Sequence, residues 1–372
     1  MTIGNTVNTL LGALMWFFIA SKLNAYEFGT LNYQISIASL FAAVGILGFD
    51  TTLTTFVAKG NNRMVHEASF LVMLSGGVLS IILILFLPSI PLILLVLCML
   101  IFSLIEAENL GKHKFKRYSW LLIIQRIVSL ICVPLFYQFF GIEGALYGFL
   151  VSYVVVSYEF VFWIRKIKIS VHTIIPIKKY FIHANILGIS KTLPYYFDKL
   201  IILPLYGFAI VGYYQFGIQI LAIVAMIPTI LYGYILPKEA KQSSANSMRV
   251  YSKMGIISSG IIVIIFYFTV PIAINLLFPT FKVAIASIQV ILFAGIPLTI
   301  TSVYNSVYMA KESSLVVVIG TGIFISIQTA GFFILGSIMG LMGLSVSTVF
   351  ASIAQCLYLV IQNLYLKKKQ IN

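Results

Sequence analysis

Five charged residues lie within or at the edge of long apolar stretches of this sequence: Asp50, Arg126, Lys191, Asp198 and Lys199. A charged side chain at the centre of a bilayer costs about 3 kcal/mol or more. A chain that keeps such residues therefore gives them a partner or a ligand. Cations at membrane depth suit a phosphate or another anionic group, whereas carboxylates suit ion pairing or the binding of a proton or Na⁺.

Three of these residues share one predicted helix, Ala184–Leu205. At 1.5 Å per residue, Lys191 lies about 10 Å from its cytoplasmic end and Lys199 about 22 Å. Pro194 removes a backbone donor between them and favours a kink. Such a helix could pass a diphosphate from one cation to the next. The alternative is a structural ion pair with Asp198, which we favour for Lys199, and Asp198 is also a candidate for proton or Na⁺ coupling.

Arg126 lies about seven residues into the predicted helix Ser119–Phe140. Its long side chain either reaches the cytoplasmic surface or points into a cavity. A guanidinium can form two bonds to phosphate oxygens, whereas lysine acts as a point charge. Asp50 lies near the end of the second predicted helix. Its carboxylate either pairs with a cation in the cavity or is solvated at the helix end. The candidate substrate-binding residues are thus Lys191, Arg126 and Lys199, and the candidate coupling or ion-pair residues are Asp198 and Asp50.

The elements that hold these residues are predicted from hydropathy. Apolar residues make up 60% of the 372-residue chain and charged ones 9%, whereas soluble proteins are about half apolar and about a quarter charged. A membrane-spanning helix needs about 20 apolar residues. We therefore predict an all-α polytopic membrane protein with about 12 transmembrane helices. Their approximate bounds are Ile3–Ala20, Thr30–Phe49, Ser69–Leu87, Ile90–Ile105, Ser119–Phe140, Gly144–Ile164, Ala184–Leu205, Gly212–Leu236, Gly255–Leu277, Val283–Val303, Ser314–Ile338 and Leu341–Leu364.

Lys and Arg residues mark alternate connections between these stretches. Nineteen of the 24 lie in the even connections and at the C-terminus, and only Lys22 and Lys282 lie in the odd ones. Cytoplasmic loops of membrane proteins carry such an excess, so both termini are predicted to be cytoplasmic in a multi-pass protein of the cell (inner) membrane. The same topology accounts for the net charge of +14 without nucleic-acid binding.

The longest basic connection, 165–183, divides the chain into two predicted six-helix bundles, 1–164 and 184–372. It is either a segment on the anionic cytoplasmic leaflet or an ordinary linker. Because each half has an even number of helices, the halves would be parallel repeats about a pseudo-two-fold axis along the membrane normal. A faint echo supports this: 25–33 and 208–216 each place one glycine before an aromatic-containing helix start.

Several motifs are absent from the sequence. There is no G-x-x-x-x-G-K-[ST], H-E-x-x-H or G-x-S-x-G motif, so we expect neither ATP hydrolysis nor another enzymatic activity, and no cofactor. Cys98, Cys132 and Cys356 lie in apolar stretches without metal-ligand or disulfide spacing. The N-terminus could pass for a signal peptide, but its lack of a basic n-region favours a first membrane span.

The segment 18–60 resembles the first two spans of Wzx-type polysaccharide flippases, in the multidrug/oligosaccharidyl-lipid/polysaccharide (MOP) exporter superfamily. Glu27-Phe28-Gly29 matches the E-[FY]-G turn of these proteins, and Gly48-Phe49-Asp50 matches their small-residue/Asp segment. The second half agrees at Phe197–Ile202, Val211–Tyr214 and Leu236-Pro237. The chain departs from the family in its short length and in lacking a basic residue before the first span. It also lacks a thirteenth and a fourteenth span, which argues against the lipid II flippase branch.

The resemblance implies translocation of a polyprenyl-diphosphate-linked oligosaccharide from the cytoplasmic to the outer leaflet by alternating access, for glycan biosynthesis. The implied partners are the lipid-linked oligosaccharide, membrane lipids, H⁺ or Na⁺ as a coupling ion, and glycan-assembly enzymes. One alternative is a drug/cation antiporter of the same superfamily, which would be expected to favour carboxylates over Lys and Arg. A membrane polysaccharide polymerase or glycosyltransferase would be expected to carry a long outer loop, which this sequence lacks.

Overall fold

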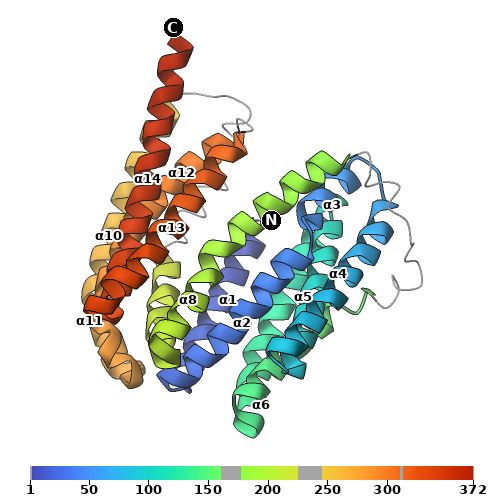
Figure 1. The fold of residues 1–372 in the computed structure, drawn as a ribbon, viewed down its shortest axis with the longest axis horizontal. Coiled ribbons are helices and arrows are strands. Elements are labelled where there is room, and N and C mark those ends of the chain that lie inside the picture. The colour runs from blue at the N-terminus through green and yellow to red at the C-terminus, as the bar shows by residue number, and fades with distance from the viewer. Residues whose placement is uncertain (1, 161–176, 225–244, 311–312, 372) are drawn as a thin grey trace. The chain divides into compact units, whose positions relative to one another are not determined.

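The computed structural model describes residues 2–160, 177–224, 245–310 and 313–371, and this part of the chain is helical throughout (Figure 1). The helices are α1 (Thr2–Ala20), α2 (Ala25–Gly45), α3 (Phe49–Ala58), α4 (Met64–Phe86), α5 (Ile90–Gly111), α6 (Phe115–Val156), α8 (Lys178–Val224), α10 (Ala245–Leu277), α11 (Ile285–Ile291), α12 (Gly295–Ala310), α13 (Ser314–Met339) and α14 (Leu341–Ile371), with 3₁₀ turns η2 (Pro279–Ala284) and η3 (Leu292–Ala294).

The chain forms two compact units. The first contains Met1–Ile19 and Thr30–Phe197, and the second contains Ala20–Gly29 and Asp198–Asn372. Helix α8 thus contributes to both units, and so does α2, whose first turn belongs to the second. The predicted division at 165–183 stays a prediction, because most of that segment lies outside the described residues. The exit of the eighth predicted span, which includes Leu236-Pro237, also lies outside them.

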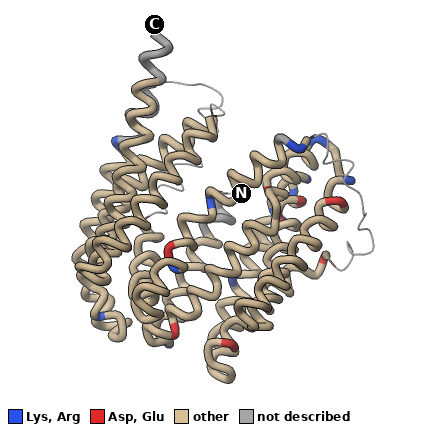
Figure 2. Tube along the Cα trace, viewed as in Figure 1, with Lys and Arg blue, Asp and Glu red and all other residues tan. Residues whose placement is uncertain are grey.

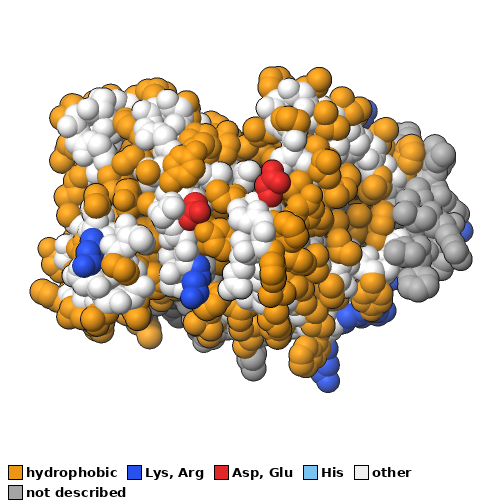
Figure 3. All heavy atoms as spheres, turned by 90° about the horizontal axis from the view of Figure 1, so that it is seen from below, with side chains coloured by type: hydrophobic (Ala, Val, Ile, Leu, Met, Phe, Trp, Pro, Cys, Tyr) orange, Lys and Arg blue, Asp and Glu red, His pale blue; other side chains and the backbone are white. Residues whose placement is uncertain are grey.

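Membrane-spanning character is plain in the described helices. Eight of them are long and apolar enough to cross a membrane, or nine if the bent pair α2 and α3 is taken as one span. Hydrophobic side chains also predominate on the face that Figure 3 shows, as expected for a protein surrounded by lipid. The chain is therefore a multi-pass membrane protein, and the predicted count of 12 helices stays a prediction.

Helix α6 is too long for one crossing. Its 42 residues would extend about 63 Å, about twice the hydrocarbon thickness. The helix is interrupted at Gly141, where φ is 61° and ψ is −141°. Arg117 near its start forms an ion pair with Glu159, just beyond its end. Gln125 also donates a hydrogen bond of 3.0 Å to the Ser152 hydroxyl. The chain therefore reverses at Gly141, and α6 is a hairpin of two antiparallel helices.

Small residues hold this hairpin together, and the same motif ends the second unit. A Cβ on Gly144 would lie 2.1 Å from the Phe136 carbonyl oxygen, and a Cβ on Gly343 would lie 2.0 Å from the Leu335 carbonyl oxygen. In each hairpin the chain reverses at a glycine with positive φ. The close contact is made by a second glycine three residues later, which packs against the carbonyl group eight residues before it. For the second hairpin, formed by α13 and α14, that reversal is Gly340, with φ 56° and ψ −132°. The motif G-x-x-G thus builds one hairpin in each predicted half.

Helix α8 also reverses at a glycine. Gly207 has φ 80° and ψ 172°. The Tyr206 hydroxyl before it donates a hydrogen bond of 2.6 Å to the Phe332 carbonyl. The Tyr214 ring after it lies 5.7 Å from the Phe332 ring. Two tyrosines on either side of the break, Tyr206 and Tyr214, therefore contact the same residue of α13.

The two glycines of the sequence echo lie against each other within the second unit. A Cβ on Gly29 would lie 1.9 Å from the Phe208 carbonyl oxygen, and a Cβ on Gly212 would lie 1.9 Å from the Ala25 carbonyl oxygen. The contact is symmetric, because each glycine meets the residue four positions before the other. Phe28, fully buried, packs its ring 5.6 Å from that of Phe281 beside this contact. The first turn of α2 is thereby fixed to α8 and η2.

A capping box begins α2 at this point. The Asn24 side-chain oxygen accepts a hydrogen bond of 2.9 Å from the Glu27 backbone N–H. The Glu27 carboxylate accepts one of 3.0 Å from the Asn24 N–H. This reciprocal arrangement satisfies two donors that a helix N-terminus leaves open. The E-F-G segment noted in the sequence is therefore the start of α2 and not a free turn.

Cations of the first unit gather at one end of its helices. Helices α4 and α5 are antiparallel neighbours, so the α3–α4 connection with Lys59 and Arg63 lies at the same end as Lys112 after α5. Figure 2 shows blue positions at this end, where α3 ends and α4 begins. This is the clustering that the alternation of charge in the sequence predicts for a cytoplasmic side.

Candidate functional site

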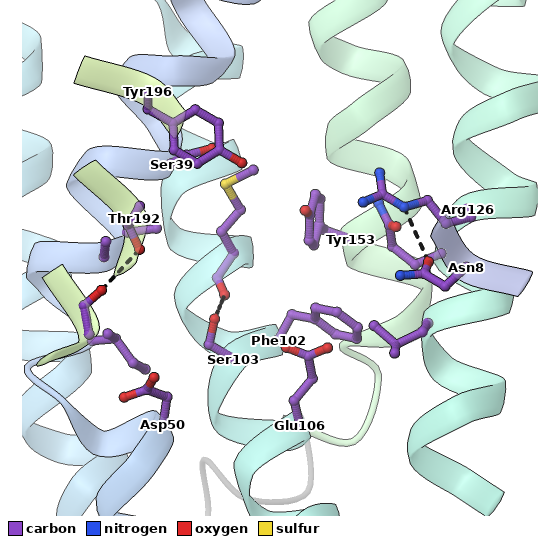
Figure 4. A pocket seen from close by; sticks show the side chains of 17 residues that line it. Asn8, Ser39, Asp50, Phe102, Ser103, Glu106, Arg126, Tyr153, Thr192 and Tyr196 are labelled. Atoms are coloured by element: carbon purple, nitrogen blue, oxygen red, sulfur yellow. Dashed lines mark hydrogen bonds between the residues drawn. The ribbon is translucent and has the colours of Figure 1, made fainter. Parts of the chain in front are cut away.

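A cavity of about 340 Å³ lies within the first unit, between α1, α2, α3, α5, α6 and α8 (Figure 4). Three charged residues line it: Arg126, Asp50 and Glu106. Amide, hydroxyl and phenol groups complete its polar wall, from Asn8, Ser39, Ser103, Gln125, Tyr153, Thr192 and Tyr196. A polar cavity among membrane-spanning helices is the usual place for a ligand or an ion pathway, because polar groups are costly against lipid.

Helical periodicity explains which residues reach the cavity. Helix α5 contributes Met99, Phe102, Ser103 and Glu106, at positions i, i+3, i+4 and i+7 of one face. The same helix turns Glu108 away, and that carboxylate pairs with Lys112 four residues later. Glu106 and Glu108 are thus two residues apart in sequence, yet they serve different surfaces.

Arg126 is anchored at one side and open at the other. Its Nε donates a hydrogen bond of 3.2 Å to the Asn8 side-chain oxygen. None of the ion pairs within 4.0 Å in the described residues includes Arg126. A guanidinium carries five N–H donors, and Asn8 uses one of them. Figure 4 shows the remaining nitrogens near Tyr153, on the cavity side of α6.

The two carboxylates occupy other parts of the wall. In Figure 4, Asp50 lies on the side opposite Arg126, and Glu106 lies between them. Glu106 interacts electrostatically with both. One oxygen of Asp50 is buried without a hydrogen-bond partner among the described residues.

A bend between α2 and α3 brings Asp50 into the cavity. The two helices meet at 47°, across Leu47 and Gly48 with φ of 54° and 75°. Positive φ is strained for Leu47, which is not glycine. Gly48 allows close approach of α8, because a Cβ there would lie 2.4 Å from the backbone nitrogen of Asn185. Asp50 follows in the first turn of α3, where the helix dipole stabilises a carboxylate.

Helix α8 supplies the wall next to Asp50. Gly188, Thr192 and Tyr196 line the cavity at intervals of four residues. The Thr192 hydroxyl donates back to the Gly188 carbonyl at 3.1 Å, which leaves its oxygen as an acceptor. Lys191 is exposed and is not a lining residue. Since one residue corresponds to about 100° of rotation, the Lys191 side chain points about 100° around the helix from that of Thr192. Its substrate-binding role stays a prediction.

Asp198 and Lys199 form a buried ion pair in the second unit. The Lys199 ammonium lies 3.0 Å from the Asp198 carboxylate, with side chains only 3% exposed, and that carboxylate also accepts the Lys199 backbone N–H at 2.8 Å. This is the arrangement that the sequence offered as an alternative to substrate binding. Tyr214, nearby, bonds the Thr348 hydroxyl at 2.9 Å. The roles predicted for Asp198 and Lys199 in coupling and substrate binding stay untested.

Sequence reasoning did not identify Glu106. The fourth predicted span ends at Ile105, whereas α5 continues to Gly111. The signal that could have found Glu106 is its register with Ser103 and Met99 on one polar-containing face. Asn8, Gln125 and Thr192 were also missed, because amides and hydroxyls are common in membrane helices and carry no spacing of their own.

A metal centre is not evident in the described part of the chain, where no group of three or more His, Cys, Asp or Glu side chains is placed to hold an ion. The cavity instead offers one guanidinium, two carboxylates and neutral hydrogen-bonding groups. Such a set can bind an anionic group at Arg126 and a proton or a small cation at the carboxylates.

The fold resembles that of transporters of known structure. A lipid II flippase MurJ in an inward closed conformation superposes with a TM-score of 0.76 at 15% identity, over 97% of this chain and 86% of that one. An inward-facing multidrug resistance MATE family transporter of the MOP superfamily gives 0.70 at 14% identity, over 97% and 96%. A MOP superfamily transporter from Pyrococcus furiosus, whose binding pocket of reversed polarity suggests a different function, gives 0.62 at 15% identity, over 98% and 93%.

No known family model matches the sequence, and a search of curated proteins also found no match. The structural likenesses, at these identities, establish the fold. The chain has the MOP-like fold that the resemblance in its sequence implied.

Proposed function

We propose that this protein is a membrane transporter that flips a polyprenyl-diphosphate-linked oligosaccharide from the cytoplasmic to the outer leaflet. The observation that carries the proposal is Arg126, a guanidinium with open donors in a polar cavity of a MOP-like fold. A diphosphate is the part of such a substrate that lipid excludes most strongly. Arg126 would form two charge-assisted hydrogen bonds to its oxygens, while the polyprenyl chain stays in lipid.

The proposal includes 12 crossings and cytoplasmic termini. The hairpins at Gly141 and Gly207 would each count as two crossings, α2 with α3 as one, and the shorter apolar helix Val7–Ala20 as the first. The G-x-x-G hairpins ending each half support two parallel bundles of six. Alternating access would then consist of the two bundles moving about the substrate. The clustering of cations at one end of the first unit supports the orientation.

Complementation of a flippase-deficient strain tests the function. Wild type is expected to restore glycan export, and Arg126→Ala is expected to fail at equal membrane expression. Loss of a charge-assisted hydrogen bond costs about 1.5–3 kcal/mol, which is more than tenfold in affinity. Arg126→Lys keeps the charge but not the fork and is expected to be intermediate.

The control variants distinguish Arg126 from Lys191 as the residue that binds the diphosphate. Lys191→Ala, at an exposed position outside the cavity, is expected to retain most of the activity, although Lys191 remains the second candidate for the headgroup. If Arg126→Ala complements as well as wild type, binding of the diphosphate at Arg126 is wrong. If wild type itself restores no export in strains with several different glycans, the flippase assignment is wrong.

A second candidate function is export of an organic cation. The specific observation in its favour is the pair of carboxylates, Asp50 and Glu106, in the same cavity. Carboxylates bind cationic drugs, and two of them exceed the single guanidinium. Drug susceptibility discriminates the functions: expression would raise resistance to ethidium or tetraphenylphosphonium if this candidate holds, and would leave it unchanged for a flippase.

A further inference from the structure

Helix α1 holds the side chain of Arg126 from one side. Asn8, Gly12 and Met15 lie at positions i, i+4 and i+7 on one face of this helix. Asn8 accepts the hydrogen bond of 3.2 Å from the Arg126 Nε. One turn further along α6, the Ser129 hydroxyl donates a hydrogen bond of 3.1 Å to the Met15 sulfur. Both contacts join the same two helix faces, so the packing of α1 on α6 fixes where Arg126 lies.

Gly12 provides the surface on which the guanidinium lies. A Cβ on Gly12 would lie 3.5 Å from the Arg126 Nε, 3.6 Å from its Cζ and 4.0 Å from its Cδ. These are ordinary van der Waals distances, so a methyl group fits there without moving the guanidinium. A larger side chain at this position would occupy the space that the guanidinium fills.

The depth of Arg126 explains why it needs this support. Arg117, near the start of α6, pairs with Glu159 at the end of the unit where cations gather. Arg126 follows Arg117 by nine residues, which places it about 14 Å further along the helix. A long cationic side chain at membrane depth extends toward the aqueous surface when nothing holds it. The contacts with α1 keep the guanidinium at the cavity instead.

The amide of Asn8 holds Arg126 without neutralising it. Since the Arg126 Nε–H is a donor, the Asn8 atom that meets it is the side-chain oxygen. An amide carries no charge, and no ion pair within 4.0 Å in the described ranges includes Arg126. Four of the five N–H donors of a guanidinium are on its two terminal nitrogens. These nitrogens, near Tyr153 in Figure 4, stay available for two oxygens of one ligand.

We propose that Asn8 and Gly12 are positioning residues, which fix the Arg126 guanidinium so that its two terminal nitrogens, and not its Nε, bind the anionic ligand. That this ligand is a diphosphate rests on the proposed function, whereas the positioning of Arg126 does not. A side chain that is already ordered loses little conformational freedom when the ligand binds. Without this order, the ligand must immobilise a long side chain, and its binding should weaken by about 2- to 13-fold.

Binding of farnesyl diphosphate to purified protein in lipid nanodiscs tests the role of Asn8. Asn8→Ala should weaken binding by about 2- to 13-fold in the wild-type background. It should cause no further loss in a chain that already carries Arg126→Ala, because Asn8 acts through Arg126. Equal losses in the two backgrounds would overturn the positioning role. Thr9→Ala, at the next and exposed position of α1, is the matched control and should bind like wild type.

Two further pairs of variants separate positioning from packing. Asn8→Asp keeps the acceptor but adds a negative charge beside Arg126. It should unfold at a temperature no lower than Asn8→Ala does, and yet bind farnesyl diphosphate more weakly. If Asn8→Asp instead restored binding, the neutral amide would have no positioning role. Gly12→Ala should bind within about twofold of wild type, whereas Gly12→Leu should lose about as much affinity as Arg126→Ala. Equal binding by the two Gly12 variants would overturn the role of that glycine.

Hydrogen exchange at the Arg126 Nε tests the positioning without any ligand. In protein labelled with ¹⁵N at the arginine Nε atoms, the Arg126 resonance is the one that is missing from the spectrum of Arg126→Lys. Its N–H should exchange with water about 2- to 13-fold faster in Asn8→Ala, the factor expected for one hydrogen bond. An unchanged exchange rate overturns the contact with Asn8. If wild type binds no farnesyl diphosphate while the exchange rate responds to Asn8→Ala, the proposed function fails and the positioning of Arg126 stands.

Discussion

The symmetric contact between Gly29 and Gly212 allows a quantitative prediction. Replacing either glycine by alanine places a Cβ 1.9 Å from a carbonyl oxygen, whereas Cβ atoms in proteins essentially never come closer than 3.0 Å to another heavy atom. The helices must therefore separate by about 1.1 Å at that point. Overpacking of this kind costs about 1–3 kcal/mol, so the closed contact should become about 5- to 150-fold less populated relative to an open one.

Cysteine cross-linking measures that population. The Tyr26 and Phe208 rings flank the contact, with centroids 5.3 Å apart. Cysteines at these two positions, in a chain whose three native cysteines are replaced, should be joined rapidly by a short thiol-reactive linker. Adding Gly29→Ala or Gly212→Ala should slow the initial cross-linking rate, because the linker joins the closed contact, and the slowing reaches the full factor of about 5 to 150 when the open form predominates.

A matched glycine controls for effects of alanine itself. Gly322 lies in α13 with nothing within 4 Å of its Cβ position, so Gly322→Ala should leave the cross-linking rate unchanged. If Gly29→Ala and Gly212→Ala also cross-link at the parental rate, the helices accommodate the methyl group without separating. The reasoning from the close contact would then be refuted. Under the proposed alternating access, the same substitutions are expected to alter transport, because this contact joins the first turn of α2 to α8.

Three further predictions follow from the packing and charges. Asp198→Asn should lower the thermal unfolding temperature, because a buried lysine without its partner lowers the free energy of unfolding by about 3–5 kcal/mol. Adding Lys199→Met should recover most of this loss. Failure to recover it would mean that the pair does more than neutralise charge. Gly144→Val and Gly343→Val should each reduce the amount of folded protein in fluorescence-detection size-exclusion profiles, because the hairpin backbones leave no room for a side chain at these positions. Normal profiles for both variants would contradict the hairpin packing. Lys191→Ala should leave the unfolding temperature unchanged within about 0.5 kcal/mol, and a clear shift would show that this exposed lysine has a structural partner.

The fold class could be predicted from the sequence because lipid imposes a strong local rule. Every membrane-spanning stretch must be apolar and long enough to satisfy its own backbone, so the bounds of helices such as α4 and α13 were predicted to within about five residues. The glycines at which the hairpins reverse were a weaker signal than the hydropathy of the spans. Only the backbone shows that Gly141 and Gly340 have positive φ, and that Gly144 and Gly343 let the hairpins close.

The site could be predicted only in part, because a cavity is made by helices far apart in sequence. Arg126 and Asp50 were identified from the cost of charge in lipid, which is a property of each residue alone. Their place around one cavity depends on the α2–α3 bend and on the way α5 and α8 pack beside it. The same packing brought in Glu106, one residue beyond a predicted span.

The sequence by itself determined that this chain spans a membrane, where its helices lie and which charges need an explanation. These follow from transfer free energies, which are sums over single residues. Tertiary structure alone decided how each charge is satisfied, because pairing depends on distance and direction. It joined Lys199 to Asp198, left Lys191 exposed, and gathered Arg126 with two carboxylates in one cavity.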